Sequence, residues 1–291
     1  MKRSSNFIPH LFASISVIVW GVTFVSTKVL IGQGLTPLQI FVYRFALAYV
    51  CMLPLIRRLW ANSLKDEICL ALGGLSGGSL YFLTENTALG ITFASNVSLL
   101  ICTAPIFTII LDRIIWKTPL RKSLLGGSLI ALVGVAVVII NGNLEFKISP
   151  LGDFLTIVAA ILWAIYSIIV RKLSRTYDTF FISRKVFFYG VVSVLPLFIA
   201  STSPAELSLL GRSAVWSNIM FLGIMASMLC YMMWNVSVKA LGADKASNYI
   251  YVNPLVTIIA SAIFLGEPLT VFTFIGAAAI IGGVFIAERC G

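Results

Sequence analysis

Two ionisable side chains fall inside apolar stretches of this sequence, where a charge is costly. Glu85 lies beside Asn86 toward the end of the run that begins at residue 67, and Arg44 lies well inside the run that begins at residue 36. A carboxyl group in such a place can carry a proton or bind a cation, and an arginine can hold a carboxylate with its planar guanidinium. The alternative is structural: Glu85 pairs with Arg44 or Lys28, or Arg44 extends to the interface. The residue types leave both interpretations open.

Aromatic and amide side chains form a second group of candidates. Trp20 and Trp163 lie mid-run rather than at the membrane–water interface, where tryptophan is usual. Asn253 precedes Pro254, and a proline frees a backbone carbonyl one turn earlier. Such groups can line a cavity for amphipathic or aromatic molecules, although packing and helix-to-helix hydrogen bonds are alternatives. Tyr231 is a further aromatic residue of this kind. The candidate cavity set is Trp20, Tyr43, Arg44, Tyr81, Glu85, Asn86, Trp163, Tyr166, Trp234, Asn235, Tyr251 and Asn253.

The sequence offers no residue set typical of an enzyme or of a bound cofactor. Its one histidine, His10, lies at the inner end of the first apolar run, and the five cysteines lack metal-ligand spacing. There is no Gly-Lys-Ser/Thr phosphate-binding loop, so this chain encodes no ATP motor. We therefore expect no catalytic residues, no metal, no cofactor and no enzymatic activity.

The composition requires the elements that carry these residues to be membrane helices. Of the 291 residues, 59% are hydrophobic and 11% are charged, whereas soluble domains carry about a quarter charged residues. The net charge of +10 does not indicate nucleic acid, because no basic stripe is interleaved with aromatic residues. We expect an all-α integral membrane protein in a lipid bilayer, with ten transmembrane helices at 9–31, 36–56, 67–89, 93–115, 122–141, 151–171, 179–200, 214–238, 244–265 and 270–287.

Basic residues are distributed unequally between alternate connections. Of the 21 lysines and arginines, seventeen fall in one alternating set of segments, and only Lys147 and Arg212 fall in the other. The positive-inside rule then places both termini in the cytoplasm of a multi-pass protein of the bacterial inner membrane. A miscounted span would scramble this alternation, so the charge distribution also favours ten spans.

The two halves of the chain match each other at rare residues. A shift of 143 pairs Trp20 with Trp163, and a shift of 149 pairs further prolines, threonines, glycines and asparagines: Asn86–Asn235, Pro105–Pro254, Thr108–Thr257, Pro119–Pro268 and Gly134–Gly283. Because each half holds five spans, an odd number, the second must enter the membrane in the opposite orientation. We predict two inverted five-helix repeats, at residues 9–141 and 151–288.

Four stretches carry a resemblance to a known family: Val19-Trp20-Gly21, the segment from Ala88-Leu89-Gly90 to Pro105, Ile161-Leu162-Trp163-Ala164, and the segment from Asn253-Pro254 to Leu265-Gly266-Glu267-Pro268-Leu269. With these the chain resembles the drug/metabolite transporter superfamily, specifically the EamA type with two five-helix modules, over residues 9–288. The first module departs from the pattern, with Trp116-Lys117-Thr118 in place of Gly-Glu. The resemblance implies export or exchange of small metabolites, such as amino acids or amphipathic compounds, by alternating access through a central cavity.

The expected function is therefore that of a secondary transporter of a small-molecule substrate. Inverted-repeat transporters bind substrate near the midplane, at the interface between the repeats, and Glu85 is the candidate for proton coupling. A non-transporting membrane assembly protein and an intramembrane enzyme are the alternatives, and the oligomeric state stays open. A water-accessible cavity at Glu85, Trp20 and Asn253 would distinguish the transporter from the assembly protein.

Overall fold

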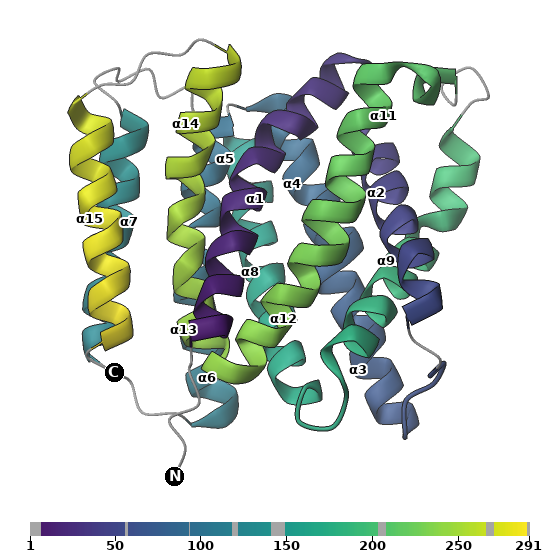
Figure 1. Ribbon diagram of the computed structural model, residues 1–291, viewed down its shortest axis with the longest axis horizontal. Coiled ribbons are helices and arrows are strands. Elements are labelled where there is room, and N and C mark those ends of the chain that lie inside the picture. The colour runs from purple at the N-terminus through teal and green to yellow at the C-terminus, as the bar shows by residue number, and fades with distance from the viewer. Residues whose placement is uncertain are drawn as a thin grey trace.

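The computed structural model describes residues 7–55, 58–92, 94–117, 122–140, 149–202, 208–265 and 271–289, and every regular element in these ranges is a helix (Figure 1). The first half contains α1 (Phe7–Gly32), α2 (Pro37–Met52), η1 (Leu53–Leu55), α3 (Leu64–Gly74), η2 (Leu75–Ser79), α4 (Leu80–Ile91), α5 (Ala94–Ile101), α6 (Ala104–Trp116) and α7 (Lys122–Ile140). The second half contains α8 (Pro150–Leu173), α9 (Thr179–Ser201), η3 (Ser208–Gly211), α11 (Ser213–Met220), η4 (Phe221–Leu229), α12 (Cys230–Leu241), α13 (Ala243–Ser247), η5 (Asn248–Val252), α14 (Asn253–Leu265) and α15 (Val271–Arg289).

Within the described ranges, six helical runs are long and apolar enough to cross a membrane: Phe7–Gly32, Pro37–Leu55, Leu64–Ile91, Pro150–Leu173, Thr179–Ser201 and Ser213–Leu241. Shorter apolar helical stretches occur at Lys122–Val137 and Phe274–Ala287. Large hydrophobic side chains such as Ile114, Ile199 and Ile263 are exposed on the outside of the bundle, as expected for a surface that faces lipid. The all-α, multi-pass membrane class is confirmed, whereas the number of ten spans and the inverted repeat stay predictions. The Gly266-Glu267-Pro268-Leu269 motif and the Pro119–Pro268 pair lie outside the described residues.

Local sequence explains where the early helices begin. The Thr36 side chain accepts a hydrogen bond from the Gln39 backbone N–H, and the Gln39 side chain accepts one from the Thr36 N–H. This reciprocal capping, with Pro37 at the first helical position, sets the start of α2. At the start of α3 the Ser63 side chain accepts a hydrogen bond from the Asp66 N–H, which caps this helix from one side. Gly34, which has a φ of 98°, supplies the left-handed turn between α1 and α2.

Two of the predicted spans are interrupted. The span predicted at 93–115 consists of α5 and α6, which meet at Cys102 and Thr103, and the span predicted at 244–265 consists of α13, η5 and α14. Pro105 and Pro254 are the second residues of α6 and α14. A proline lacks the N–H that would continue the preceding helix and clashes with the carbonyl one turn before it. Each proline therefore accounts for a break immediately upstream.

Two further spans contain a π-helical segment, η2 within Leu64–Ile91 and η4 within Ser213–Leu241. In η2, Gly78 departs from helical geometry, with φ −125° and ψ −105°. A Cβ at Gly77 would overlap the ring of Tyr166, so the close approach of α8 to η2 requires a glycine there. Such π segments inside long helices are frequent near functional sites.

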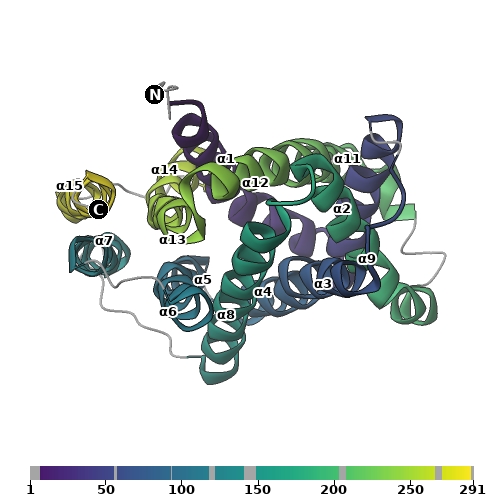
Figure 2. The same cartoon turned by 90° about the horizontal axis from the view of Figure 1, so that it is seen from below.

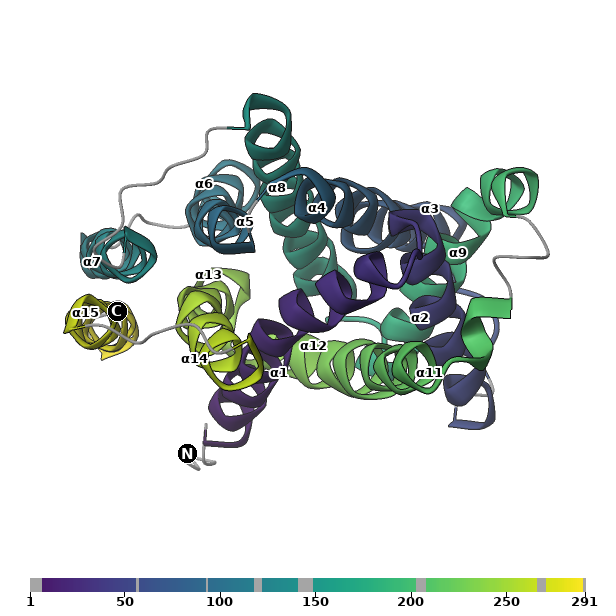
Figure 3. The ribbon, with the colours of Figure 1, turned by 90° about the horizontal axis from the view of Figure 1, so that it is seen from above.

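The helices that carry the candidate residues gather around the centre of the bundle. Seen from below and from above, α1, α4, α8 and α12 surround the middle, and α7 and α15 lie side by side at one edge (Figures 2 and 3). Glycines allow α7 and α15 to approach closely. A Cβ at Gly127 would lie 2.5 Å from the carbonyl oxygen of Gly283, and a Cβ at Gly134 would lie 2.8 Å from the carbonyl oxygen of Gly276. The buried core lies between α1, α2, α4, α8 and α12.

Candidate functional site

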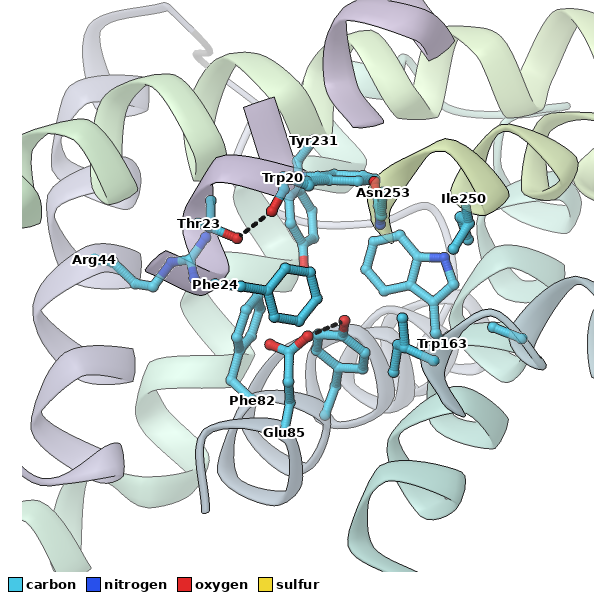
Figure 4. A pocket seen from close by; sticks show the side chains of 13 residues that line it. Trp20, Thr23, Phe24, Arg44, Phe82, Glu85, Trp163, Tyr231, Ile250 and Asn253 are labelled. Atoms are coloured by element: carbon cyan, nitrogen blue, oxygen red, sulfur yellow. Dashed lines mark hydrogen bonds between the residues drawn. The ribbon is translucent and has the colours of Figure 1, made fainter. Parts of the chain in front are cut away.

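A central cavity brings both halves of the chain together (Figure 4). The empty space between its walls is about 450 Å³, and this volume includes the part that opens to solvent. Helices α1, α2, α4, α8 and α12 contribute to its wall, together with the two interrupted spans at α5–α6 and η5–α14. The lining residues are Trp20, Thr23, Phe24, Arg44, Tyr81, Phe82, Glu85, Ile101, Ala104, Trp163, Tyr231, Ile250 and Asn253.

Arg44 is the cation of this cavity, and its side chain is held from two sides. It is only 2% exposed, its Nε donates a hydrogen bond to the Ser227 Oγ over 2.9 Å, and its Cζ lies 4.4 Å from the centroid of the Phe82 ring. Ser227 belongs to η4 and Phe82 to α4. A guanidinium buried in this way is stable only with compensating groups, and an anion is the strongest of these.

Glu85 is the acid of the same cavity. It is 7% exposed, and its Oε1 accepts a hydrogen bond of 2.7 Å from the hydroxyl of Tyr81, one helical turn earlier. Within the described part of the chain, Glu85 and Arg44 do not approach to the 4.0 Å of an ion pair. Figure 4 shows the Glu85 carboxyl group between Arg44 on one side and Trp163 on the other. The direct Arg44–Glu85 pair, one of the structural alternatives, is therefore not formed.

Aromatic rings make up much of the wall between these charges. Trp20 and Trp163 meet at 5.1 Å between ring centroids and stand nearly perpendicular, at 87°. Tyr81 packs on Trp163 at 5.2 Å, and Tyr231 packs on Trp20 at 5.9 Å. The Trp20 Nε1 donates to the carbonyl of Ala226 over 2.9 Å, which fixes its ring. Ring faces arranged like this attract cationic groups and shield them from water.

Six of the twelve candidate residues line the cavity and six do not. The lining ones are Trp20, Arg44, Tyr81, Glu85, Trp163 and Asn253. Trp234 lies fully buried behind them, 5.2 Å from the Trp20 ring and 5.8 Å from the Trp163 ring. It supports the wall without forming it.

The other five serve contacts between helices. The Tyr166 hydroxyl donates to Asn235 Oδ1 over 2.8 Å, and Asn235 Nδ2 donates to Ser183 Oγ over 2.9 Å, so these two candidates join α8, α12 and α9. Asn86 Nδ2 donates to the Pro37 carbonyl over 3.4 Å. Tyr43 packs edge-on against Phe198 at 5.7 Å, and Tyr251 is buried in the core.

Sequence reasoning missed part of the cavity wall. Thr23 and Phe24 follow Trp20 by three and four residues, and Phe82 precedes Glu85 by three, so helical periodicity around the chosen residues would have found them. The remaining missed residues include Tyr231, which was noted as an aromatic, and the residues that flank the helix breaks, Ile101, Ala104 and Ile250.

A separate polar cluster joins α3 to α9 outside the cavity. Glu67 forms an ion pair with Lys185 and accepts a hydrogen bond from the Tyr189 hydroxyl. Tyr177, between α8 and α9, donates to Asp66 over 2.7 Å, and burial together with this hydrogen bond raises the pKa of Tyr177. These groups satisfy one another, as structural contacts do, whereas Arg44 and Glu85 share a cavity without pairing.

Comparison with known proteins identifies the chain. The model of the EamA-like transporter family matches residues 7–140 and 150–288. The chain belongs to the EamA-like transporter family. The resemblance predicted from the sequence is thereby confirmed, and the protein is a transmembrane transporter.

Relatives of this EamA-like transporter cover nearly its whole length. The chain is 30% identical to "Uncharacterized transporter YyaM" of Bacillus subtilis (strain 168), over 99% of this chain and 95% of the relative. It is 26% identical to "Probable amino-acid metabolite efflux pump" of Salmonella typhimurium, over 98% and 95% of the two chains. A solved structure titled "Crystal structure of protein" matches with a TM-score of 0.81 and 18% identity over 100% of both chains, which shows a shared fold.

Proposed function

We propose that this EamA-like protein is a secondary transporter, and not an enzyme, that exports or exchanges small zwitterionic metabolites such as amino acids. The observation that carries the proposal is the pair of opposite charges, Arg44 and Glu85, buried on one cavity without an ion pair between them. A substrate that bears both a carboxylate and an ammonium group complements both.

The contacts of each charge assign the two ends of such a substrate. Ser227 and Phe82 fix the Nε and one face of the Arg44 guanidinium, and the planar group can then hold a carboxylate through two hydrogen bonds. Glu85, held by Tyr81, takes the ammonium group, and the faces of Trp20 and Trp163 add cation–π attraction. The name of the Salmonella relative supports both amino-acid substrates and efflux.

We also propose the topology and coupling on which alternating access rests. Ten spans form two inverted repeats, 9–141 and 151–288, with both termini in the cytoplasm. The charge distribution supports this orientation, and the helix breaks before Pro105 and Pro254, which the shift of 149 pairs, support the repeat. Both broken spans border the cavity, as discontinuous helices do at transporter sites. Glu85 is the residue that would carry a coupling proton.

The test is transport by the purified protein in liposomes. Wild type preloaded with unlabelled amino acids should accumulate labelled amino acid by exchange, and Arg44→Lys should raise KM about tenfold because an ammonium cannot replace a planar fork. Arg212→Lys is the matched control, since Arg212 lies outside the cavity and donates to Gln33. Absence of exchange by wild type across a panel of zwitterionic amino acids, or an unchanged KM in Arg44→Lys, would contradict the proposal.

A further inference from the structure

Two polar atoms of the cavity wall are deeply buried and lack a hydrogen-bond partner among the described residues: Trp163 Nε1 and Asn253 Oδ1. The side chains are 4% and 5% exposed. Buried donors and acceptors are almost always paired in folded proteins, because an unpaired group forfeits its hydrogen bonds to water. Two such atoms on one cavity therefore indicate a ligand that completes them.

The two residues mark the end of the cavity away from Arg44. Figure 4 shows Trp163, Ile250 and Asn253 together on one side of the pocket, with Arg44 on the other and Glu85 between them. Trp163 comes from α8 and Asn253 is the first residue of α14. A molecule that reaches from Arg44 past Glu85 would meet them last.

Both groups are held in place by their neighbours. The Trp163 ring packs against Trp20 and Tyr81, at 5.1 and 5.2 Å between centroids. The backbone of Asn253 is fixed against α1: a Cβ at Gly21 would lie 3.0 Å from the Asn253 carbonyl oxygen, which accepts a hydrogen bond from Thr257. A tryptophan ring and an asparagine backbone that are already held in place reduce the ordering cost of binding.

A comparison with two other core tryptophans shows what distinguishes the unpaired N–H of Trp163. The Trp20 Nε1, on the same wall, has the Ala226 carbonyl as its acceptor. The Trp234 Nε1 also lacks a partner among the described residues, but Trp234 does not line the cavity. Among the described tryptophans, Trp163 alone combines an unpaired N–H with a place on the cavity wall, and the same wall contains Asn253 with its unpaired Oδ1.

We propose that Trp163 and Asn253 form a specificity subsite for a substrate group that both donates and accepts a hydrogen bond at one atom, namely a hydroxyl. This inference rests on the proposed transport of zwitterions. A hydroxyl oxygen accepts from the Trp163 N–H while its hydrogen goes to Asn253 Oδ1. A carboxylate would satisfy only the tryptophan and an ammonium only the asparagine. The substrate class is then an amino acid whose side chain carries a hydroxyl.

The test uses pairs of amino acids that differ by one hydroxyl, serine with alanine and tyrosine with phenylalanine. Their competition against a labelled amino acid is measured with wild-type protein in liposomes. Wild type should prefer the hydroxylated member of at least one pair by about tenfold, the effect of one well-made hydrogen bond in a buried site. This measurement needs no variant and so does not depend on a variant that folds.

Variants then assign the preference to the two side chains. Trp163→Phe keeps an aromatic ring and removes the N–H, and Asn253→Leu keeps the volume and removes the amide, so either should reduce the preference to about twofold or less. Trp234→Phe removes an unpaired N–H outside the cavity and should leave the preference intact. Equal competition within both pairs in wild type, or an equal effect of Trp163→Phe and Trp234→Phe, would overturn the subsite alone. Failure of all four amino acids to compete would instead overturn the proposed function, and the subsite with it.

Discussion

The runs Leu64–Ile91 and Ser213–Leu241 have the same local build but different chemistry. Each is an α-helix, a π segment and a second α-helix. The shift of 149 that pairs Asn86 with Asn235 also places η2, residues 75–79, inside η4. Yet the same shift pairs Glu85 with Trp234 and Tyr81 with Cys230. The first run therefore brings an acid to the cavity, whereas the second has at the paired position a tryptophan that is buried behind the cavity wall.

This difference shows how a repeated scaffold yields a one-sided site. The π segments give both runs the same local helix geometry. Single residues on that geometry determine whether the run contributes a charge to the cavity. The two runs also cooperate at Arg44: Phe82 from α4 covers the guanidinium, and Ser227 from η4 accepts its Nε hydrogen. Each run thus supplies one contact to the same cation, and only α4 adds the acid that a zwitterion requires.

The largest effect is expected from removing the acid that the first run brings to the cavity. Glu85→Gln should abolish transport driven by a proton gradient, because an amide cannot release a proton. Exchange between identical pools should continue at a raised KM, because the amide also lacks the charge that holds the substrate ammonium group. Trp234→Phe, at the paired position, should retain both activities. Uptake into liposomes with and without an imposed pH gradient separates the two readouts. Equal loss of both activities in Glu85→Gln, or loss of neither, would contradict a coupling role for Glu85.

The composition predicted the helical membrane class, and repeat matching singled out Trp20 and Trp163 as an equivalent pair. Both predictions rest on the fact that membrane helices are apolar throughout. A tryptophan, an asparagine or a charged residue is rare there and is therefore easy to recognise. Six of the candidates lie on the cavity for this reason. The other six look the same in the sequence, since an asparagine that joins two helices, such as Asn235, is as polar as one that faces a cavity.

The interruptions of the helices were harder to foresee. Pro105 and Pro254 were recognised as a pair, but their spans were predicted without breaks. The π segments depend on tertiary packing: Gly77 accommodates the Tyr166 ring from a helix far away in the sequence. No local pattern encodes such a contact, so Ser227, which anchors Arg44 from η4, was missed.

A smaller effect is expected where the two π segments pack against their neighbours. Gly77→Ala should destabilise the protein by about 1–3 kcal/mol, because its Cβ would overlap the Tyr166 ring, which also carries the hydrogen bond to Asn235. In Gly223→Ala the new Cβ meets Cδ2 of Leu47 at 2.6 Å and its Cγ and Cβ at 3.0 and 3.1 Å, and a rotamer change of the leucine moves the nearest of these atoms away. Its cost should be below about 1 kcal/mol. Thermal unfolding of the two variants purified in detergent measures which loses more stability. If Gly77→Ala were the more stable of the two, η2 would not depend on this close contact.

The smallest effect is expected at the two contacts that the runs make with Arg44. Ser227→Ala removes the acceptor of the Arg44 Nε and should raise the KM for amino-acid exchange about fivefold, the value of one hydrogen bond. Phe82→Leu removes the ring beneath the guanidinium and should raise it by about two- to fivefold. Ser217→Ala is the control, because Ser217 is exposed and bonds only within its own helix. If both runs position one cation, the Ser227→Ala/Phe82→Leu double variant should raise KM by less than the product of the two single effects. Once either contact is removed, Arg44 is already misplaced, so removing the other adds little. Strictly multiplicative effects would mean that the two runs act on the substrate independently, and the shared anchoring of Arg44 would then have no part in binding.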